Sequence, residues 1–379
     1  MLEATLGQAQ HHEDLTIFPI LAEEEWELPY GLMAEALAMG ILTIGEKDGG
    51  TVPTLIATNT GIQPILILDG EQLIGAKQNR MTNRSMILPP NSITEIPVSC
   101  MEQGRWHFRS GTFAPAPQNA PSKVRRKARE TEARAAQDAA IRGYGARASH
   151  RDLAQAQGAV WEEIRAFEDK LGRSSDTGAL DSVYESRRPE LSRWVGAFSL
   201  VLSQIGLVAF QGKVPLGMDA VGSPRLYAKV HERVLTGYVL DAMEGRAGSA
   251  LGSAYGSASR TPGDQGEDRR QTAGGPGQPD DDRRQPRLDP PPSIFAERFI
   301  ERMRDAERMP SEPVGLGEYR VLKGNVVGSE LVDQDKLVHL SAFPADDYAG
   351  RWDRSGQTRP PRPRNPGPIQ RPSQRKRRY

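Results

Sequence analysis

The chain has 379 residues, enough for two domains, and its formal charge is zero because it carries 49 basic and 49 acidic side chains. Zero net charge gives no overall field that would favour nucleic acid or a membrane, and a single cysteine excludes an intramolecular disulfide and a cysteine-rich metal site. With 29 prolines, 38 glycines and 6% aromatic residues, part of the chain is expected to be unstructured.

The N-terminus has neither a basic segment nor an apolar run, so we expect no signal peptide and a flexible stretch over residues 1–14. The longest apolar stretch, residues 195–210, is interrupted by Ser203, Gln204 and Gly206 and is too short to span a bilayer. We therefore expect a cytoplasmic protein without a membrane partner.

Residues 15–113 read as β-rich. Asp69-Gly70 lies between two apolar runs and is typical of a tight hairpin turn. Residues 29–39 predict a short helix, which starts with Pro29 and is ended by Gly40. The expected strands are Leu15–Leu21, Ile41–Glu46, Thr54–Thr58, Ile65–Leu68, Gln72–Ile74, Ser85–Leu88 and Ile93–Ser99.

A proline-rich hinge at 114–122 separates this part from a helical and hairpin part over 121–244. Lys123–Ile141 is charged and alanine-rich with a weak apolar stripe, which predicts an exposed helix. Ser149 is a good cap for the next helix, whose apolar residues keep helical spacing until Gly172 ends it.

Low-complexity composition marks residues 245–292 as a disordered insertion and 344–379 as a disordered, basic Pro/Arg tail. The tail is a candidate contact for a weak acidic partner. The remaining elements are a hairpin at 205–218 turning at Gln211-Gly212, a helix from Ser223-Pro224 to Gly245, a helix at 293–308 and a hairpin at 319–331 around Lys323-Gly324-Asn325.

These signals predict an α+β fold with a mainly antiparallel, sandwich-like sheet and packed helices. The globular unit is expected to cover residues 15–343 as one domain, made of a β-rich part (15–113) and helical and hairpin parts (121–244 and 293–343). The final hairpins are too small to be stable alone, so two independent domains are not expected.

Several segments resemble one bacterial family. They are GEQLIGAKQNR, LPPNSITEIPVSC, EQGRW, TGALDSVYE, QIGLVAFQGKVPLGMDAVGSP and VGLGEYRVLKGNVVGSELVDQDKLVHLSAF. Together they resemble the ARG and Rhodanese-Phosphatase-superfamily-associated protein domain over residues 15–343. That family is named for proteins encoded near it, the ADP-ribosylglycohydrolases and rhodanese-phosphatase proteins. The resemblance implies a link to ADP-ribose or phosphoester metabolism and no specific activity.

The strongest candidate site is Lys77-Gln78-Asn79-Arg80, with Glu71 and Asn83 nearby. Lysine and arginine pair with phosphate or carboxylate, and the side-chain amides of Gln78 and Asn79 can form hydrogen bonds with a ribose or a base edge. The alternative is a polar strand end with satisfied local hydrogen bonds. Asp219 is a further candidate, because a helix starts just after it and a helix N-terminus favours an anion; alternatively, Asp219 only supports the turn.

Cys100 misses the spacing of a cysteine phosphatase, since Arg105 follows after four residues and Trp106 takes the required position. We expect Cys100 to be buried and structural. The histidines, His339 among them, form no metal-binding motif, so we expect neither a metal nor a cofactor.

Two functions remain open. The first is a non-catalytic ligand-binding or interaction module that recognises an ADP-ribose-like, nucleotide or phosphorylated group. The second is a hydrolase of a phosphoester or ADP-ribosyl linkage, with Glu71 or Asp219 as general base and Arg80 as anion clamp. Convergence of Glu71, Asp219 or His339 on residues 77–80 in one pocket would favour the hydrolase.

Overall fold

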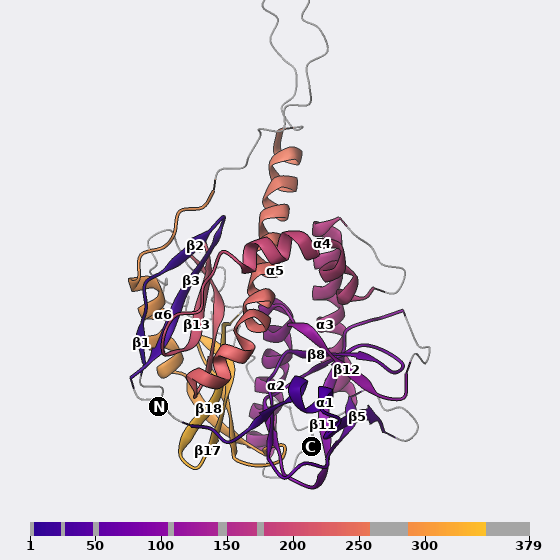
Figure 1. Ribbon diagram of the computed structural model, residues 1–379. Coiled ribbons are helices and arrows are strands. Elements are labelled where there is room, and N and C mark those ends of the chain that lie inside the picture. Colours follow the sequence, from indigo (N-terminus) through magenta and orange to yellow (C-terminus); the bar gives the residue numbers. More distant parts are fainter. Residues whose placement is uncertain are drawn as a thin grey trace, which may run out of the picture.

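The computed structural model describes residues 4–23, 27–47, 53–104, 110–142, 150–172, 178–257 and 287–345 (Figure 1). The α+β class and the mainly antiparallel, sandwich-like sheet with packed helices are as predicted. Among the described helices, none is long and apolar enough to cross a membrane.

A nine-stranded antiparallel sheet forms one half of the molecule, with strand order β1-β3-β13-β14-β18-β17-β16-β15 and β2 also paired with β3. Its strands are β1 (Ala4–Leu6), β2 (Gln10–His12), β3 (Leu15–Ala22), β13 (Gln204–Gln211), β14 (Val214–Val221), β15 (Glu307–Ser311), β16 (Glu318–Lys323), β17 (Val326–Asp333) and β18 (Lys336–Pro344). The hairpins predicted at 205–218 and 319–331 are confirmed as β13–β14 and β16–β17.

The other half, which we call the β-rich lobe, contains a six-stranded sheet ordered β12-β8-β9-β11-β6-β5 and a three-stranded sheet ordered β10-β7-β4. Its strands are β4 (Gly31–Leu32), β5 (Leu42–Glu46), β6 (Thr54–Asn59), β7 (Ile65–Ile67), β8 (Glu71–Gly75), β9 (Arg80–Thr82), β10 (Met86–Leu88), β11 (Ser92–Cys100) and β12 (Phe113–Asn119). The β4–β7 pair is parallel.

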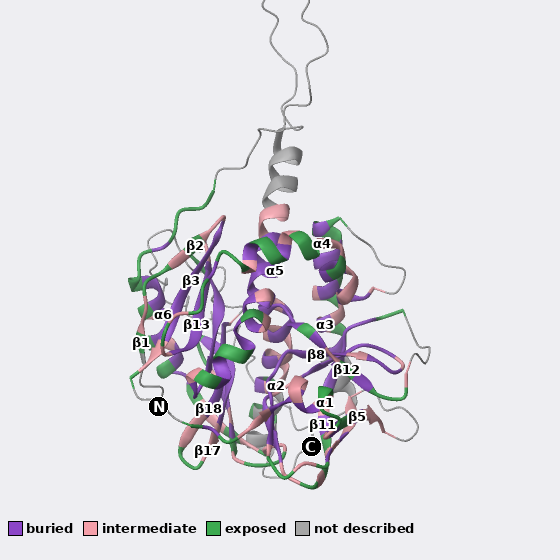
Figure 2. Ribbon diagram, in the orientation of Figure 1, coloured by how far each residue is buried: buried purple, intermediate pink, exposed green. Residues whose placement is uncertain are grey.

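The helices are α1 (Met33–Ala38), α2 (Ser122–Arg142), α3 (His150–Leu171), α4 (Leu180–Val195), α5 (Pro224–Ser257) and α6 (Ile294–Arg304). Helix α6 covers one face of the large sheet, and α2 and α5 lie between its other face and the β-rich lobe (Figure 1). The strands of the large sheet are therefore buried on both faces over much of their length (Figure 2).

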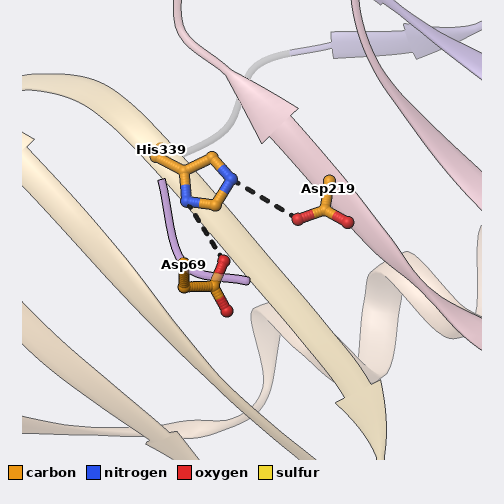
Figure 3. Close-up of side chains that lie close together, drawn as sticks. All are labelled: Asp69, Asp219 and His339. Carbon is orange, nitrogen blue, oxygen red and sulfur yellow. Dashed lines mark ion pairs between the residues drawn. The ribbon is translucent and has the colours of Figure 1, made fainter. Parts of the chain in front are cut away.

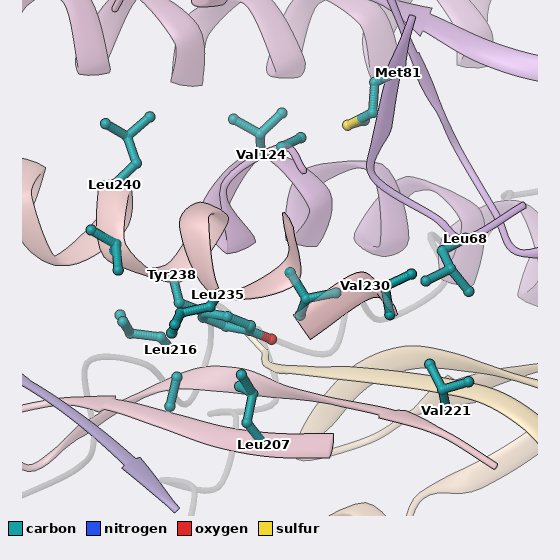
Figure 4. Packing of buried hydrophobic residues seen from close by; sticks show 14 of the residues in the cluster. Leu68, Met81, Val124, Leu207, Leu216, Val221, Val230, Leu235, Tyr238 and Leu240 are labelled. Carbon is teal, nitrogen blue, oxygen red and sulfur yellow. The ribbon is translucent and has the colours of Figure 1, made fainter. Parts of the chain in front are cut away.

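One apolar cluster runs through the centre of the molecule, and Figure 4 shows part of it. In this cluster, Leu235 and Tyr238 of α5 lie near Leu207 of β13. Leu68 of the β-rich lobe and Val124 of α2 belong to the same cluster. Burial of each such side chain contributes about 1.5–3 kcal/mol. The cluster holds α2 and α5 between the two halves, and this arrangement positions the polar groups described below.

The Asp69-Gly70 hairpin prediction is wrong. Strand β7 pairs with β10 and β4, whereas β8 pairs with β12 and β9, so the turn links two sheets instead of two paired strands. Gly70 has φ +79°, and a Cβ there would lie 2.6 Å from Cδ of Arg125. The glycine therefore provides the turn geometry and also the space for the Arg125 side chain.

The N-terminal stretch expected to be flexible forms strands β1 and β2, which both pair with β3. Main-chain pairing with a buried strand orders them despite their polar sequence. Residues 1–3 lie outside the described residues. Strand β3 itself, expected in the β-rich part, belongs to the large sheet, where it pairs with β13.

Helix lengths also differ from the predictions. Helix α5 continues past Gly245 to Ser257, so the start of the expected insertion is helical, while residues 258–286 lie outside the described part. Residues 346–379 of the tail also lie outside the described part. Helix α1 is shorter than expected, and α6 ends at Arg304, before β15.

Candidate functional site

Two clusters of buried polar groups contain residues predicted as site candidates. The Asp219 cluster comprises Asp219, Asp69, His339, Ser85 and Arg125, and it lies where the large sheet, α2 and the β-rich lobe meet. The Arg80 cluster comprises Arg80, Gln78, Cys100 and Glu46, and it lies within the β-rich lobe.

In the Asp219 cluster, the His339 ring lies between two carboxylates (Figure 3). Its Nε2 is 3.4 Å from Asp219 Oδ1 and its Nδ1 is 3.9 Å from Asp69 Oδ1. His339 comes from β18 and Asp219 from the adjacent β14, whereas Asp69 comes from the turn before β8. All three side chains are only 1% exposed.

Arg125 of α2 forms ion pairs with both carboxylates. Its Nη2 donates to Asp69 Oδ1 and Asp219 Oδ1, both at 2.6 Å, and its Nη1 donates to Asp219 Oδ2 at 2.8 Å. The Tyr238 hydroxyl donates to Asp219 Oδ2 at 2.7 Å. Burial by itself would raise the pKa of Asp219, but the Arg125 charge and its hydrogen bonds outweigh burial and hold that pKa well below its usual range.

Asp69, Asp219 and His339 offer ligand atoms within 4.8 Å of one another, a spacing that suits a metal ion. However, the carboxylate oxygens that would bind a metal already accept hydrogen bonds from Arg125. A divalent cation would also lie against the guanidinium charge. The donor set of Asp69 and Asp219 therefore fits an arginine better than a metal.

Ser85 extends the cluster into a hydrogen-bonded chain. Its Oγ accepts the backbone N–H of Asp69 at 3.0 Å and lies 2.7 Å from His339 Nδ1. If the hydroxyl donates to Nδ1, the Nε2–H of His339 points at Asp219. Serine, histidine and aspartate then follow one another in the order of a nucleophile, its base and the orienting acid. Ser85, however, is as buried as the other members.

Helix α2 contributes a second buried arginine to the same sheet face. Arg129 donates to the Tyr319 hydroxyl at 2.5 Å and pairs with Glu132. Arg125, Arg129 and Glu132 are spaced so that they lie on one face of α2. The buried face of this helix is therefore polar. The prediction that this helix is exposed was wrong because it was based on the weak apolar stripe alone.

In the Arg80 cluster, Arg80 of β9 and Cys100 of β11 are register partners. The guanidinium Nη1 donates to Gln78 Oε1 at 3.0 Å and contacts the Cys100 sulfur. The Cys100 thiol donates to the same Gln78 oxygen at 3.2 Å. Burial raises the pKa of the Cys100 thiol to about 11, although the Arg80 charge acts in the opposite direction.

The Arg80 guanidinium is fully buried and only partly satisfied. Its Nε and Nη2 have no hydrogen-bond partner among the described residues. Its ion-pair partner there, Glu46 at the end of β5, lies 3.7 Å from Nη2, beyond hydrogen-bonding distance. A buried positive charge with unused donors is unfavourable unless an acceptor is supplied.

The other predicted site residues have different roles. Gln78 and Asn79 are buried and bonded to the main chain or side chain of Glu102. Glu71 accepts the Leu68 N–H and pairs with Arg233 of α5. The expected surface segment 77–80 therefore faces mostly inward.

Glu71, Asp219 and His339 do not converge on residues 77–80. The partners of Asp219 belong to the Asp219 cluster and α5, and those of Arg80 belong to the β-rich lobe. Asn83 donates its backbone N–H to Pro97, and its side-chain oxygen is buried without a partner among the described residues.

The full sequence matches the ARG and Rhodanese-Phosphatase-superfamily-associated Protein domain over residues 3–343. The chain belongs to this family. The match covers both halves of the structure and both polar clusters. No curated protein and no solved structure matches the chain.

The sequence patterns did not indicate Asp69, Ser85 or Arg125 as members of a polar cluster, and His339 belonged to no motif. A usable signal was present, because His339 and Asp219 each interrupt an otherwise apolar strand, in KLVHLSAF and VPLGMDAV. A charged residue in a strand that is buried on both faces needs a partner.

Proposed function

We propose that this member of the family is a non-catalytic binding module for an anionic ligand of the ADP-ribose-like, nucleotide or phosphorylated class. The observation that carries the proposal is the buried Arg80 guanidinium, which has two nitrogen atoms without an acceptor and no carboxylate in hydrogen-bonding distance among the described residues. A phosphate or carboxylate supplies the acceptors that such a fork prefers.

The state of the acids supports binding over catalysis. A general base must be free to take a proton. Asp219 is instead held as an anion by Arg125 and Tyr238, and Glu71 is paired with Arg233. Neither of the acids considered for catalysis has the freedom that a hydrolytic mechanism requires.

The test is calorimetric titration with ADP-ribose, AMP and inorganic phosphate. We expect Arg80→Lys to weaken binding by about 1–3 kcal/mol, since the ammonium keeps the charge and loses the fork. Arg320→Lys is the matched control, because Arg320 forms a surface pair with Glu318. Equal affinity in Arg80→Lys and the wild type would contradict the proposal, provided that both proteins are folded by circular dichroism.

A hydrolase of a phosphoester or ADP-ribosyl linkage is the second candidate, and the Ser85–His339–Asp219 chain favours it. In that case the Ser85 hydroxyl would attack the phosphorus or the anomeric carbon, and His339 would take its proton. The bond from that atom to the leaving group would break, the leaving group would accept the proton from His339, and water would then hydrolyse the covalent intermediate. Assays with bis-p-nitrophenyl phosphate and ADP-ribosylated peptides test it. Turnover that disappears in both Ser85→Ala and His339→Gln would replace the binding proposal by this one.

A weak acidic partner for the basic tail is a separate proposal, supported only by the composition of residues 344–379, of which 346–379 lie outside the described part.

A further inference from the structure

Glu46 is the ion-pair partner of Arg80 among the described residues. It is the last residue of β5, an edge strand of the six-stranded sheet. Its side chain is 15% exposed, whereas that of Arg80 is fully buried. Glu46 is therefore the member of this ion pair that solvent reaches.

The contacts of the Glu46 carboxylate are poor. Its Oε1 is 3.4 Å from the Lys77 backbone N–H and 3.7 Å from Arg80 Nη2, and its Oε2 is buried without a hydrogen-bond partner among the described residues. A buried ion pair is stabilising only when its geometry is good and its remaining atoms are satisfied. Here the acid and the arginine both have unused hydrogen-bonding atoms.

The rest of the cluster is neutral. Gln78 is an amide, and Cys100 is a thiol deep in the lobe. Glu46 is thus the carboxylate within 4 Å of the guanidinium in the part of the chain that the structure describes. Any other anion that binds Arg80 must compete with this one side chain.

We propose that Glu46 is an internal substitute for the ligand's anion, and that a small oxyanion, such as the phosphoryl group of a ligand, displaces it and binds Arg80. This inference rests on the proposed function and adds a competing group to it. Movement is feasible at Glu46 because a glutamate side chain at a strand end can change rotamer without breaking strand pairing. Gln78 and Cys100 have no such freedom, because they are buried.

The test compares the affinity for inorganic phosphate of the wild type and Glu46→Gln by calorimetry. Glutamine keeps the shape and loses the competing charge, so phosphate should bind about tenfold more tightly to Glu46→Gln. Glu95→Gln is the control, since Glu95 is exposed and pairs with Lys47. Its affinity should equal that of the wild type.

Adding Arg80→Lys to Glu46→Gln should reverse the gain, which shows that the anion binds at this arginine. Phosphate binding to the wild type without a gain in Glu46→Gln overturns the inference and leaves the proposed function standing. If the wild type and all variants fail to bind phosphate, AMP and ADP-ribose, the inference and the proposed function both fail.

Discussion

At the scale of single residues, Arg80 and Cys100 are register partners in the β-rich lobe, and their side chains are in contact. The thiol is fully buried, and its main chain is bonded on both sides to the Gln157 side chain of α3. Burial raises the pKa of Cys100 to about 11. A neutral, enclosed thiol is a poor nucleophile, so we assign Cys100 to packing and to orienting Arg80.

We expect native Cys100 to react with a thiol reagent at least a hundredfold more slowly than the urea-unfolded chain, because reaction requires opening of the lobe. Cys100→Ala should lower the free energy of unfolding by about 1–2 kcal/mol for the small cavity. Stopped-flow labelling and urea unfolding measure the two effects. Rapid labelling of the folded protein would show that the thiol is accessible.

At the scale of elements, ion pairs and hydrogen bonds hold the buried face of α2 against the rest of the protein. Arg125 bridges Asp69 of the β-rich lobe and Asp219 of the large sheet, and its guanidinium lies 4.9 Å from the ring centroid of Phe343. Asp241 of α5 accepts the N–H groups of Ser122 and Lys123 at the start of the helix. The helix is thus held by polar partners at its first turn and along its inner face.

Arg125→Met should therefore destabilise the protein strongly, by about 3–5 kcal/mol, because two buried carboxylates lose their counter-charge. Lys127→Ala on the same helix should cost less than about 1 kcal/mol, since the pair of Lys127 with Glu130 is partly exposed. Guanidinium unfolding compares the two. Similar losses for both variants would mean that the bridge is unimportant for stability.

At the scale of the whole molecule, the buried acids Asp219 and Asp241 make the free energy of unfolding depend on pH in opposite directions. The pKa of Asp219 is held low, so its contribution is present above about pH 4 and is lost as the pH falls further. Burial raises the pKa of Asp241 to about 6, although contacts with Lys123 and Ser122 oppose the shift. Asp241 therefore favours the folded state at low pH and loses that contribution as the pH rises from about 4 to about 6.

We expect Asp241→Asn to remove this second dependence. Asparagine keeps an acceptor for the Ser122 N–H and carries no charge, so the variant should gain up to about 2–3 kcal/mol relative to the wild type between pH 4 and pH 7. Urea unfolding at pH 4, 5, 6 and 7 measures the difference. A constant difference across this range would show that Asp241 has an ordinary pKa.

The sequence by itself determined many of the local elements. The turn residues Gln211-Gly212 and Lys323-Gly324-Asn325 located the hairpins β13–β14 and β16–β17, and helical spacing located α3. Helix α4 was missed although Leu180, Val183 and Tyr184 have helical spacing. These properties depend on neighbouring residues along the chain, which is why a single sequence suffices to find them.

The tertiary structure alone decided which elements pair and which polar residues meet. Asp69-Gly70 has the sequence of a hairpin turn, yet its two strands pair with other partners. Arg125, Asp219 and His339 come from three distant segments, and only the packing of α2 on the sheet brings them together. Packing within the β-rich lobe buries Arg80, although the polar run at residues 77–80 had indicated a surface group. Burial and partner choice depend on contacts between distant segments, so a local pattern can indicate that Asp219 and His339 need partners but cannot identify those partners.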